Sequence, residues 1–344
     1  MFDRLIENLQ QQITGVRNAI MTSDLLRSYY TGAIRVSPKN KAIKELRIIS
    51  PDNTEWRIYD HCAAVTRLYS IYEGFVEKLI ASWLNTLPDL VPVYADLDEA
   101  IRKTHRYGVG QLLRELDKDR YEDVRAEQVI QGIYNGLFAS DRYELLPAVF
   151  LMREQNLRRS TLEKIFANAG VANCWNWIEK HRNTQDFIRD VRGHSNTAES
   201  ELTALVQYRN EASHSDEVEQ FLSAKGLLEV ADFVEALCLS LTELLNYKIL
   251  VHRERRGEVR LIGEITESFR SGAVVARVEH ATLSIGEHIF LESEGRSWCC
   301  QGAITSIQLN NISENIIEIR DATEVGFLFD TPVRTRLKLW QQVK

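Results

Sequence analysis

Six consecutive residues bring together side chains that could act on a phosphodiester. The segment from Arg209 to His214 contains a permanent cation, the carboxamide of Asn210, the hydroxyl of Ser213 and an imidazole. An arginine can hold a phosphate, and a histidine can move a proton near neutral pH. In RNA scission, the histidine would take the proton of the ribose 2′-hydroxyl, while the arginine would hold the scissile phosphate and its developing charge. This chemistry needs no metal ion.

The spacing of the motif favours a site shared between two chains. On one helix, Arg209 and His214 lie roughly 140° apart, whereas Asn210 and His214 share a face. One chain supplies one arginine and one histidine. A symmetric dimer that places two such segments face to face would supply two of each, so we expect a homodimer with a composite site.

A second arginine–histidine pair has the same spacing. Arg189 and His194 also lie five residues apart, so spacing alone indicates no more than two surface residues of a helical turn. Gly193 predicts an ordinary helix end at that pair. The later pair differs because Asn210 follows its arginine, Tyr208 precedes it and helical patterns flank it.

Composition limits the classes of protein and of site. The 344 residues, 44% of them hydrophobic, suffice for two domains or for a large domain with a small one. The net charge of −7 means that any RNA site must be a local basic patch. The five cysteines form no CxxC pair and no histidine has metal-ligand spacing, so we expect no disulfide framework, metal or cofactor. Lacking a signal peptide and a membrane-spanning apolar stretch, the chain is expected to be soluble and cytoplasmic.

The apolar pattern predicts an α + β multidomain chain, with a large helical domain over residues 1–252. Helical spacing marks residues 1–27, 60–87, 97–139, 142–170, 172–190, 199–213 and 218–250. Between the first two helices, residues 46–49 and 56–59 flank a Pro-Asp-Asn sequence, which predicts a small hairpin insertion. Pro88 and Pro92 are expected to end the helix that follows.

Residues 257–344 have a different pattern. Their apolar positions alternate with a period of two, and glycines separate the runs. About seven short strands in so short a segment predict a small closed barrel or a sandwich. We place the domain boundary near residue 253.

Other candidates for chemistry are weaker. Trp175 and Trp177 could stack on bases, but they are expected in the core. Residues 158–159 and 253–256 are rich in arginine and could bind phosphates, although such charged clusters are usually solvated. His105 is expected at the surface.

The segment from Tyr208 to His214 resembles the RNxxxH signature of the HEPN superfamily, which comprises prokaryotic ribonucleases and nucleotide-binding helical domains. Residues 67–76, with two tyrosines before Glu-Gly-Phe-Val, are similar to a helix of the large variants called RiboL-PSP or MAE-28990-like. A third match runs from Asn156-Leu157 to Gly170. The resemblance covers roughly residues 1–250.

The resemblance implies an all-α core, a homodimer, metal-independent RNA cleavage and a role as a toxin or anti-phage defence effector. Carried over by position, Arg209 and His214 are the catalytic pair and Asn210 orients them. Three further residues are candidates for support: Glu73, which is equally well a solvated helix residue, Ser213 and Tyr208. The RNA substrate stays open between tRNA, rRNA and mRNA, and an antitoxin or defence-system protein is an implied partner.

The C-terminal part resembles the second domain of elongation factor Tu and its relatives, a β-barrel. The match covers about residues 257–340, with Glu287 in place of the usual aspartate. Such barrels bind RNA ends, ribosomal surfaces or neighbouring domains and are not catalytic. Fold analogy alone does not choose among these roles.

Three functions are therefore compared. The first is a metal-independent endoribonuclease. The second is a non-catalytic HEPN-type adaptor that binds nucleotides or proteins in a defence or toxin–antitoxin complex. The third is a translation-associated factor, although the chain has no GTPase signature. The intact set of Arg209, Asn210 and His214 favours the enzyme, because an adaptor would be free to lose it.

Overall fold

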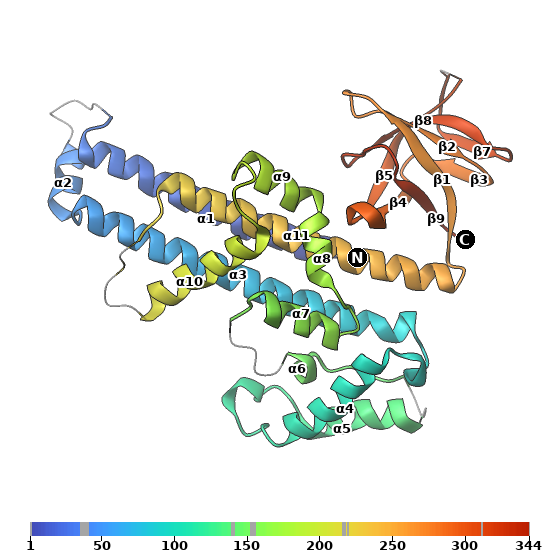
Figure 1. Ribbon diagram of the computed structural model, residues 1–344, viewed down its shortest axis with the longest axis horizontal. Coiled ribbons are helices and arrows are strands. Elements are labelled where there is room, and N and C mark those ends of the chain that lie inside the picture. The colour runs from blue at the N-terminus through green and yellow to red at the C-terminus, as the bar shows by residue number, and fades with distance from the viewer. Residues whose placement is uncertain are drawn as a thin grey trace. The chain divides into compact units, whose positions relative to one another are not determined.

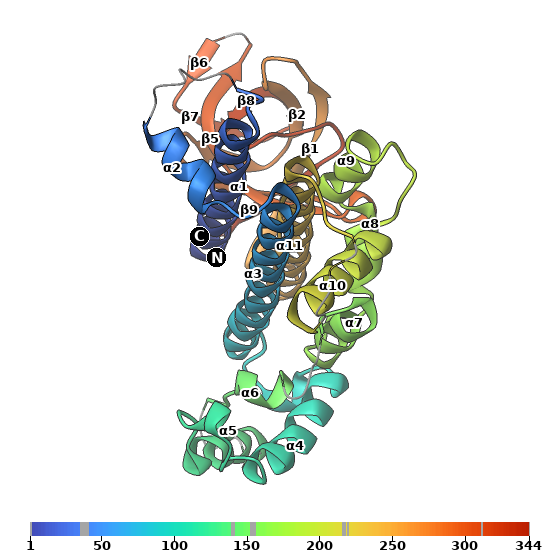
Figure 2. The same cartoon turned by 90° about the vertical axis from the view of Figure 1, so that its left-hand side faces the viewer.

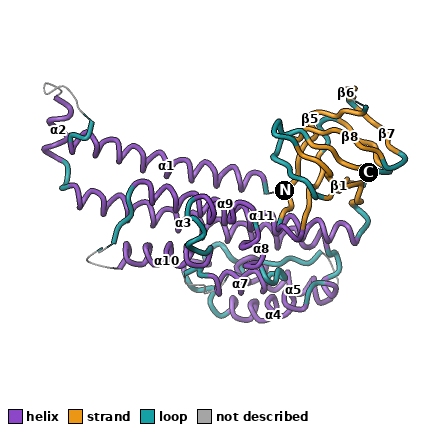
Figure 3. The backbone as a smooth tube through the Cα atoms, turned by 45° about the horizontal axis from the view of Figure 1, so that its top comes forward, coloured by secondary structure: helices purple, strands orange, loops and turns teal. Residues whose placement is uncertain are grey.

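The chain folds into two compact units. The structure, a computed structural model, describes residues 2–34, 41–138, 142–151, 156–214, 218, 220–310 and 312–343, without the side chains of residues 43, 47, 120 and 214. Unit 1 comprises residues 1–86, 93–179 and 183–239, and unit 2 comprises residues 87–92, 180–182 and 240–344. The α-helices, purple in Figure 3, precede the strands, drawn in orange, along the chain.

Helices occupy most of the described chain up to residue 255. They are α1 (Asp3–Thr31), α2 (Lys41–Ile49), α3 (Asn53–Leu90), α4 (Glu99–Leu113), α5 (Ala126–Phe138), α6 (Pro147–Phe150), α7 (Arg159–Asn168), α8 (Cys174–Lys180), α9 (Arg182–Asp190), α10 (Ala198–His214) and α11 (Ala224–Arg255). Within the described residues, none of them is long and apolar enough to cross a bilayer.

Three long helices, α1, α3 and the first half of α11, form the centre of unit 1 (Figures 1 and 2). Apolar residues at helical spacing are buried on each, including Leu9, Ile13, Val16 and Ile20 on α1, Val65, Leu68, Val76 and Leu79 on α3, and Leu227, Val234 and Leu237 on α11. Ion pairs fix the same neighbours: Arg27 donates to Asp60 on α3 (2.8 Å), and Arg17 donates to Glu235 on α11 (2.8 Å).

The predicted hairpin insertion is wrong. Residues 46–49 belong to α2, and residues 56–59 belong to α3. The reason lies in Asp52, whose carboxylate oxygen accepts the N–H groups of Thr54 (2.7 Å) and Glu55 (3.1 Å). These bonds satisfy the first turn of α3, so the Pro-Asp-Asn sequence begins a helix and does not form a hairpin turn.

The helix α3 also continues past the proline that was expected to end it. Pro88 lies inside α3, which ends at Leu90, and Pro92 follows the helix. A proline at position 88 removes only the hydrogen bond to the Leu84 carbonyl, and it does so in the last turn. The N–H of Val91 still donates to the Leu87 carbonyl (2.7 Å).

A smaller group of helices in unit 1 buries a histidine that was predicted at the surface. The helix α4 packs against α5 and α6, and Gly108 lies where α4 meets Val149. His105 on α4 is completely buried, its ring is stacked with that of Phe150, and its Nδ1 lies 3.0 Å from the Tyr94 hydroxyl. Burial lowers the pKa of His105 to about 4, so the native ring is neutral.

Unit 2 contains a closed antiparallel barrel. Its strands are β1 (Val259–Ser268), β2 (Val274–Val278), β3 (Ala281–Ser284), β4 (His288–Ser293), β5 (Trp298–Leu309), β6 (Ile312–Glu314), β7 (Ile316–Ile319), β8 (Thr323–Phe329) and β9 (Lys338–Gln342). Six strands pair in the order β4-β9-β1-β2-β8-β5, and β5 pairs with β4 to close the barrel. The strand β6 extends from β5, while β3 and β7 pair with each other. Alternate residues, such as Ile265, Val274, Val325 and Leu339, fill the interior.

A buried carboxylate joins the second half of α11 to the barrel inside unit 2. Glu243 accepts hydrogen bonds from Arg182 Nη1 (2.7 Å) and from the backbone N–H of Cys299 (3.1 Å). The guanidinium carbon of Arg182 lies 3.8 Å from the centroid of the Trp298 ring. Burial alone would raise the pKa of Glu243, but hydrogen bonds and charges from His181 and Arg182 lower it to about 2.

His105 predicts a pH dependence of stability. The unfolded ring takes up a proton near pH 6.5 and the native ring only near pH 4, so the unfolded state binds more protons between these values. The free energy of unfolding should therefore fall as the pH decreases from 6.5 towards 4, by up to about 1.4 kcal/mol per pH unit from this residue. Urea denaturation over this range should show a shallower slope for His105→Gln. Identical slopes for the variant and the wild type would contradict the prediction.

Candidate active site

The residues of the motif lie on the last turns of α10. The buried side chains of Leu202, Leu205 and Val206 anchor this helix in unit 1. Tyr208, Arg209 and the residues that follow them continue the same helix to His214. The backbone of His214 ends α10, whereas its side chain and residues 215–217 lie outside the described part of the chain.

Arg209 is held by two neutral groups. Its guanidinium carbon lies 4.2 Å from the centroid of the Tyr69 ring on α3, a cation–π contact. Its Nη1 donates a hydrogen bond to the side-chain oxygen of Asn210 (3.1 Å). Among the described residues, no carboxylate forms an ion pair with Arg209, in contrast to Arg17, Arg27, Arg182 and Arg192.

Tyr69 is itself fixed by hydrogen bonds at the buried end of its side chain. Its hydroxyl accepts the N–H of Leu157 (2.8 Å) and donates to Glu73 Oε1 (3.3 Å). Burial raises the pKa of Tyr69, the Leu157 N–H and the Arg209 charge lower it, and the Glu73 charge raises it, with a net increase. Tyr69 therefore stays a neutral phenol that can donate to Glu73.

Both backbone polar groups of Leu157 form hydrogen bonds with tyrosines of α3. Its N–H donates to Tyr69, and its carbonyl accepts from the hydroxyl of Tyr72 (3.2 Å). Asn156, directly before it, has a left-handed backbone with φ of 57°. The three stretches that resembled HEPN proteins, which are far apart in the sequence, therefore meet at Tyr69.

Glu73 is placed beside the motif through Tyr69. It lies one turn after Tyr69 on α3, is partly buried and accepts the tyrosine hydroxyl. The charge of Glu73 and burial together raise the pKa of Glu77, one turn further along, with burial as the larger cause. Glu73 thus has a hydrogen-bond partner next to Arg209, and its support of the site stays a prediction.

A buried histidine behind the motif escaped the sequence analysis. His61 on α3 is completely buried, and its ring meets that of Tyr208 edge to face, with 5.3 Å between centroids. Its Nδ1 accepts the N–H of Leu222, which precedes α11 (3.2 Å). Burial lowers the pKa of His61, although the charge of Glu211 acts in the opposite direction. The sequence signal was its position, one turn before the buried Val65 on the same face of α3.

The remaining candidates divide between surface and core. Ser213 is exposed on the last turn of α10. Arg189 is exposed and paired with Asp186 and Asp190, and His194 follows the end of α9 with a left-handed backbone. Trp175 and Trp177 are buried, as predicted.

Each of the two arginine-rich candidates contains an arginine that is engaged within the protein. Arg159 pairs with Glu199 (2.5 Å) and lies over the Trp175 ring, 5.4 Å from its centroid. In unit 2, Arg256 donates to the carbonyl of Asp89 and pairs with Glu258 (2.8 Å). Within the described ranges, no group of three or more histidine, cysteine, aspartate or glutamate residues is arranged to hold a metal ion.

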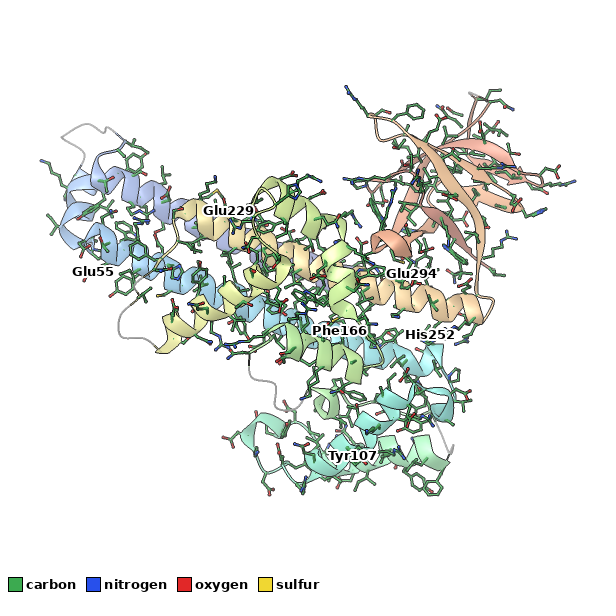
Figure 4. The ribbon with its side chains drawn as sticks, viewed as in Figure 1. Glu55, Tyr107, Phe166, Glu229, His252 and Glu294 are labelled. Atoms are coloured by element: carbon green, nitrogen blue, oxygen red, sulfur yellow. The ribbon has the colours of Figure 1, made fainter. Side chains whose placement is uncertain are left out.

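The hydroxyl of Tyr69 predicts a measurable contribution to stability. Tyr69→Phe removes the only acceptor that the described residues offer to the buried Leu157 N–H, so we expect a loss of about 1–3 kcal/mol in the free energy of unfolding. The matched control is Tyr107→Phe, at an exposed tyrosine of α4 (Figure 4), which should change stability by less than about 0.5 kcal/mol. Chemical denaturation measures both. Equal effects of the two substitutions would show that the buried hydroxyl has no special role.

Comparison with known proteins assigns the chain to a family. A protein-family model described as RiboL-PSP-HEPN matches residues 34–247, more than half of the 344 residues. The match contains all of α3 and α10, and therefore the contact between Tyr69 and Arg209. No curated protein matches the sequence. HEPN domains are a family of ribonucleases, and this chain belongs to the RiboL-PSP-HEPN family.

Proposed function

We propose that the protein is a metal-independent endoribonuclease. The observation that carries the proposal is the state of Arg209, a cation held by an aromatic face and a carboxamide, with no carboxylate partner among the described residues. A cation arranged in this way keeps its charge for an anionic ligand and presents a planar fork of donors to a phosphate. Membership of a ribonuclease family makes RNA the natural substrate.

In the proposed reaction, His214 acts as the general base and Arg209 as the electrostatic stabiliser. The imidazole takes the proton of a ribose 2′-hydroxyl, and the 2′-oxygen attacks the adjacent phosphorus. The bond from phosphorus to the 5′-oxygen breaks, leaving a 2′,3′-cyclic phosphate on one fragment. The leaving 5′-oxygen takes a proton from a second, protonated imidazole. Arg209 stabilises the charge on the phosphoryl oxygens during this step, and Asn210 orients its guanidinium.

The same mechanism requires a homodimer. One chain contributes one His214 and one Arg209, whereas the reaction uses one imidazole as the base and another as the acid. A symmetric pair of α10 helix ends would supply both. We propose that Tyr69 and Glu73 support Arg209 in each half of this composite site, and that Tyr208 anchors the helix end through His61.

The two regions of the chain would divide the work. We propose that residues 1–252 carry the catalytic site and that residues 257–344 recognise RNA, the translation machinery or a partner protein. The closed six-stranded antiparallel barrel is compatible with the resemblance to the second domain of elongation factor Tu. The role as a toxin or defence effector belongs to the same proposal.

Substitutions in the motif test the reaction. His214→Ala and Arg209→Ala should each reduce the rate of RNA cleavage by about 10²–10⁴-fold in buffer containing EDTA, because each removes a group that acts in the transition state. Arg4→Ala, at an exposed arginine of α1, serves as the control and should cleave at the wild-type rate. Circular dichroism and light scattering check that fold and oligomeric state are unchanged. Undiminished cleavage by a folded His214→Ala protein would disprove the mechanism.

The adaptor function has one observation in its favour. The helix α5 exposes an apolar stripe formed by Ile130, Tyr134, Leu137 and Phe138. Such a stripe is typical of a surface that binds another protein. As an alternative, the protein would be a non-catalytic HEPN-type adaptor in a defence or toxin–antitoxin complex.

Growth on expression separates the two functions. An endoribonuclease toxin should arrest growth of the expressing cells, and His214→Ala should restore it. Total RNA isolated after brief expression should show new ends for the wild type and none for the variant. Normal growth together with intact RNA in the wild type would favour the adaptor.

A further inference from the structure

The helix α4 carries a group of cations on an acidic chain. Residues 100–114 contain four arginine and lysine residues and no carboxylate, although the whole chain has 49 acidic residues against 42 basic ones. Three of the four, Lys103, Arg106 and Arg114, are exposed. Among the described residues, no carboxylate forms an ion pair with any of these three. This part of unit 1 is therefore a local basic surface.

The helical repeat places these cations on one side of α4 and its core contacts on the other. Positions 103, 106, 107, 110 and 114 follow one another at intervals of three and four residues, so they form one stripe. The buried positions, among them His105 and Gly108, lie on the opposite side, where they contact Phe150 and Val149 of α6. From its first cation to its last, the stripe is about 16 Å long, at about 1.5 Å per residue.

An aromatic ring lies within the same stripe. Tyr107, labelled in Figure 4, is 72% exposed, more than any other aromatic side chain among the described residues. Three positions further along, Gly110 has no side chain, and no atom lies within 4 Å of the place where a Cβ would be. The surface beside the phenol ring is therefore open to a ligand.

The charges next to the stripe leave its cations available. On other helices, several exposed cations have a carboxylate partner one turn away, as in the pairs Lys41–Glu45, Arg159–Glu163, Arg189–Asp186 and Lys225–Glu229. On α4, the acidic residue Glu99 lies four residues before Lys103 but forms no ion pair with it. Glu115, directly after the stripe, is buried and pairs with Lys118 (3.3 Å).

A single nucleic acid strand has the chemistry that fits this stripe. Its phosphates repeat at regular intervals, so that cations spaced along a helix can contact several of them. An exposed aromatic ring provides a face on which any unpaired base can stack. An anionic membrane would instead require apolar side chains beside the cations, and apart from the phenol ring of Tyr107 the stripe has none.

We propose that this stripe, the α4 face, binds single-stranded RNA, with Lys103, Arg106 and Arg114 on its phosphates and Tyr107 stacked on a base. The inference rests on the proposed ribonuclease function and names a surface that holds the substrate away from the reacting phosphate. None of these four residues belongs to the motif. The α4 face therefore contributes to the affinity for RNA and not to the step in which the bond breaks.

Two triple variants of the full chain separate local contacts from total charge. The test variant removes the three cations of the α4 face: Lys103→Gln, Arg106→Gln and Arg114→Gln. The control variant removes the same charge at exposed positions of α1, α2 and α3: Arg4→Gln, Lys44→Gln and Lys78→Gln. The probe is a fluorescein-labelled single strand of 2′-O-methyl RNA, which has no free 2′-hydroxyl to attack its phosphates. Fluorescence anisotropy over a range of salt concentrations gives the dissociation constants.

The test variant should bind the probe about tenfold more weakly or worse near physiological salt. The slope of log affinity against log salt should become shallower by about 2, because each lost phosphate contact removes about 0.7 from it. The control variant should keep the wild-type slope and an affinity within about twofold. Tyr107→Ala should weaken binding about fivefold or more and leave the slope unchanged, because it removes stacking and no charge.

Equal affinities and slopes in the test and control variants would overturn the proposal. So would binding to phosphatidylserine vesicles that the test variant loses, together with no binding of the RNA probe by the wild type. Cleavage of RNA with free 2′-hydroxyls separates the two proposals. If the α4 face is right, the test variant raises KM and keeps the wild-type kcat. If the endoribonuclease proposal alone fails, this RNA stays intact while the binding pattern remains.

Discussion

A hydroxyl that is removed from water has to be paired inside the protein, and in Tyr69 this requirement fixes three segments at once. The hydroxyl accepts from Leu157 and donates to Glu73, so the ring can take only one orientation. The guanidinium of Arg209, on α10, lies over the face of this ring. The position of the cation therefore follows from the hydrogen bonds of a residue on another helix.

Some arginines of the protein are paired with carboxylates, whereas Arg209 keeps its charge. Arg17, Arg27 and Arg192 are paired with carboxylates that connect helices, and Arg182 lies between a buried glutamate and an indole ring. Those charges hold the fold together. Arg209 instead contacts a phenol ring, 4.2 Å from its centroid, and a carboxamide oxygen at 3.1 Å, and these groups orient a guanidinium without cancelling its charge. On a chain with a net charge of −7, the proposed binding of an anionic substrate depends on a local positive charge of this kind.

Local patterns in the sequence predicted the helical region and the barrel, because each depends on the periodicity of neighbouring residues, whereas the catalytic role of the motif stays a prediction. The hairpin was wrong since a Pro-Asp-Asn sequence fits both a turn and a helix cap, and only the bonds of Asp52 decide between them. His105 was wrongly predicted at the surface because its burial depends on Phe150 of α6. His61 was missed because its burial depends on Tyr208 of α10, far away in the sequence. The role of Tyr69 required Leu157 and Arg209 to be neighbours in space, which no spacing in the chain reveals.

Unit 2 is assembled from three separate stretches of chain, and Glu243 joins two of them, residues 180–182 and residues 240–344. A barrel that begins at residue 257 would lack Arg182, which lies over the Trp298 ring, and Glu243, which accepts the N–H of Cys299. The isolated barrel would therefore lack contacts that the whole chain provides, although its strands close on themselves. A change at Arg182, the first residue of α9, would therefore remove contacts that Glu243 and the Trp298 ring of β5 make. Exchange of the barrel between proteins would have to carry residues 180–182 and the end of α11 with it.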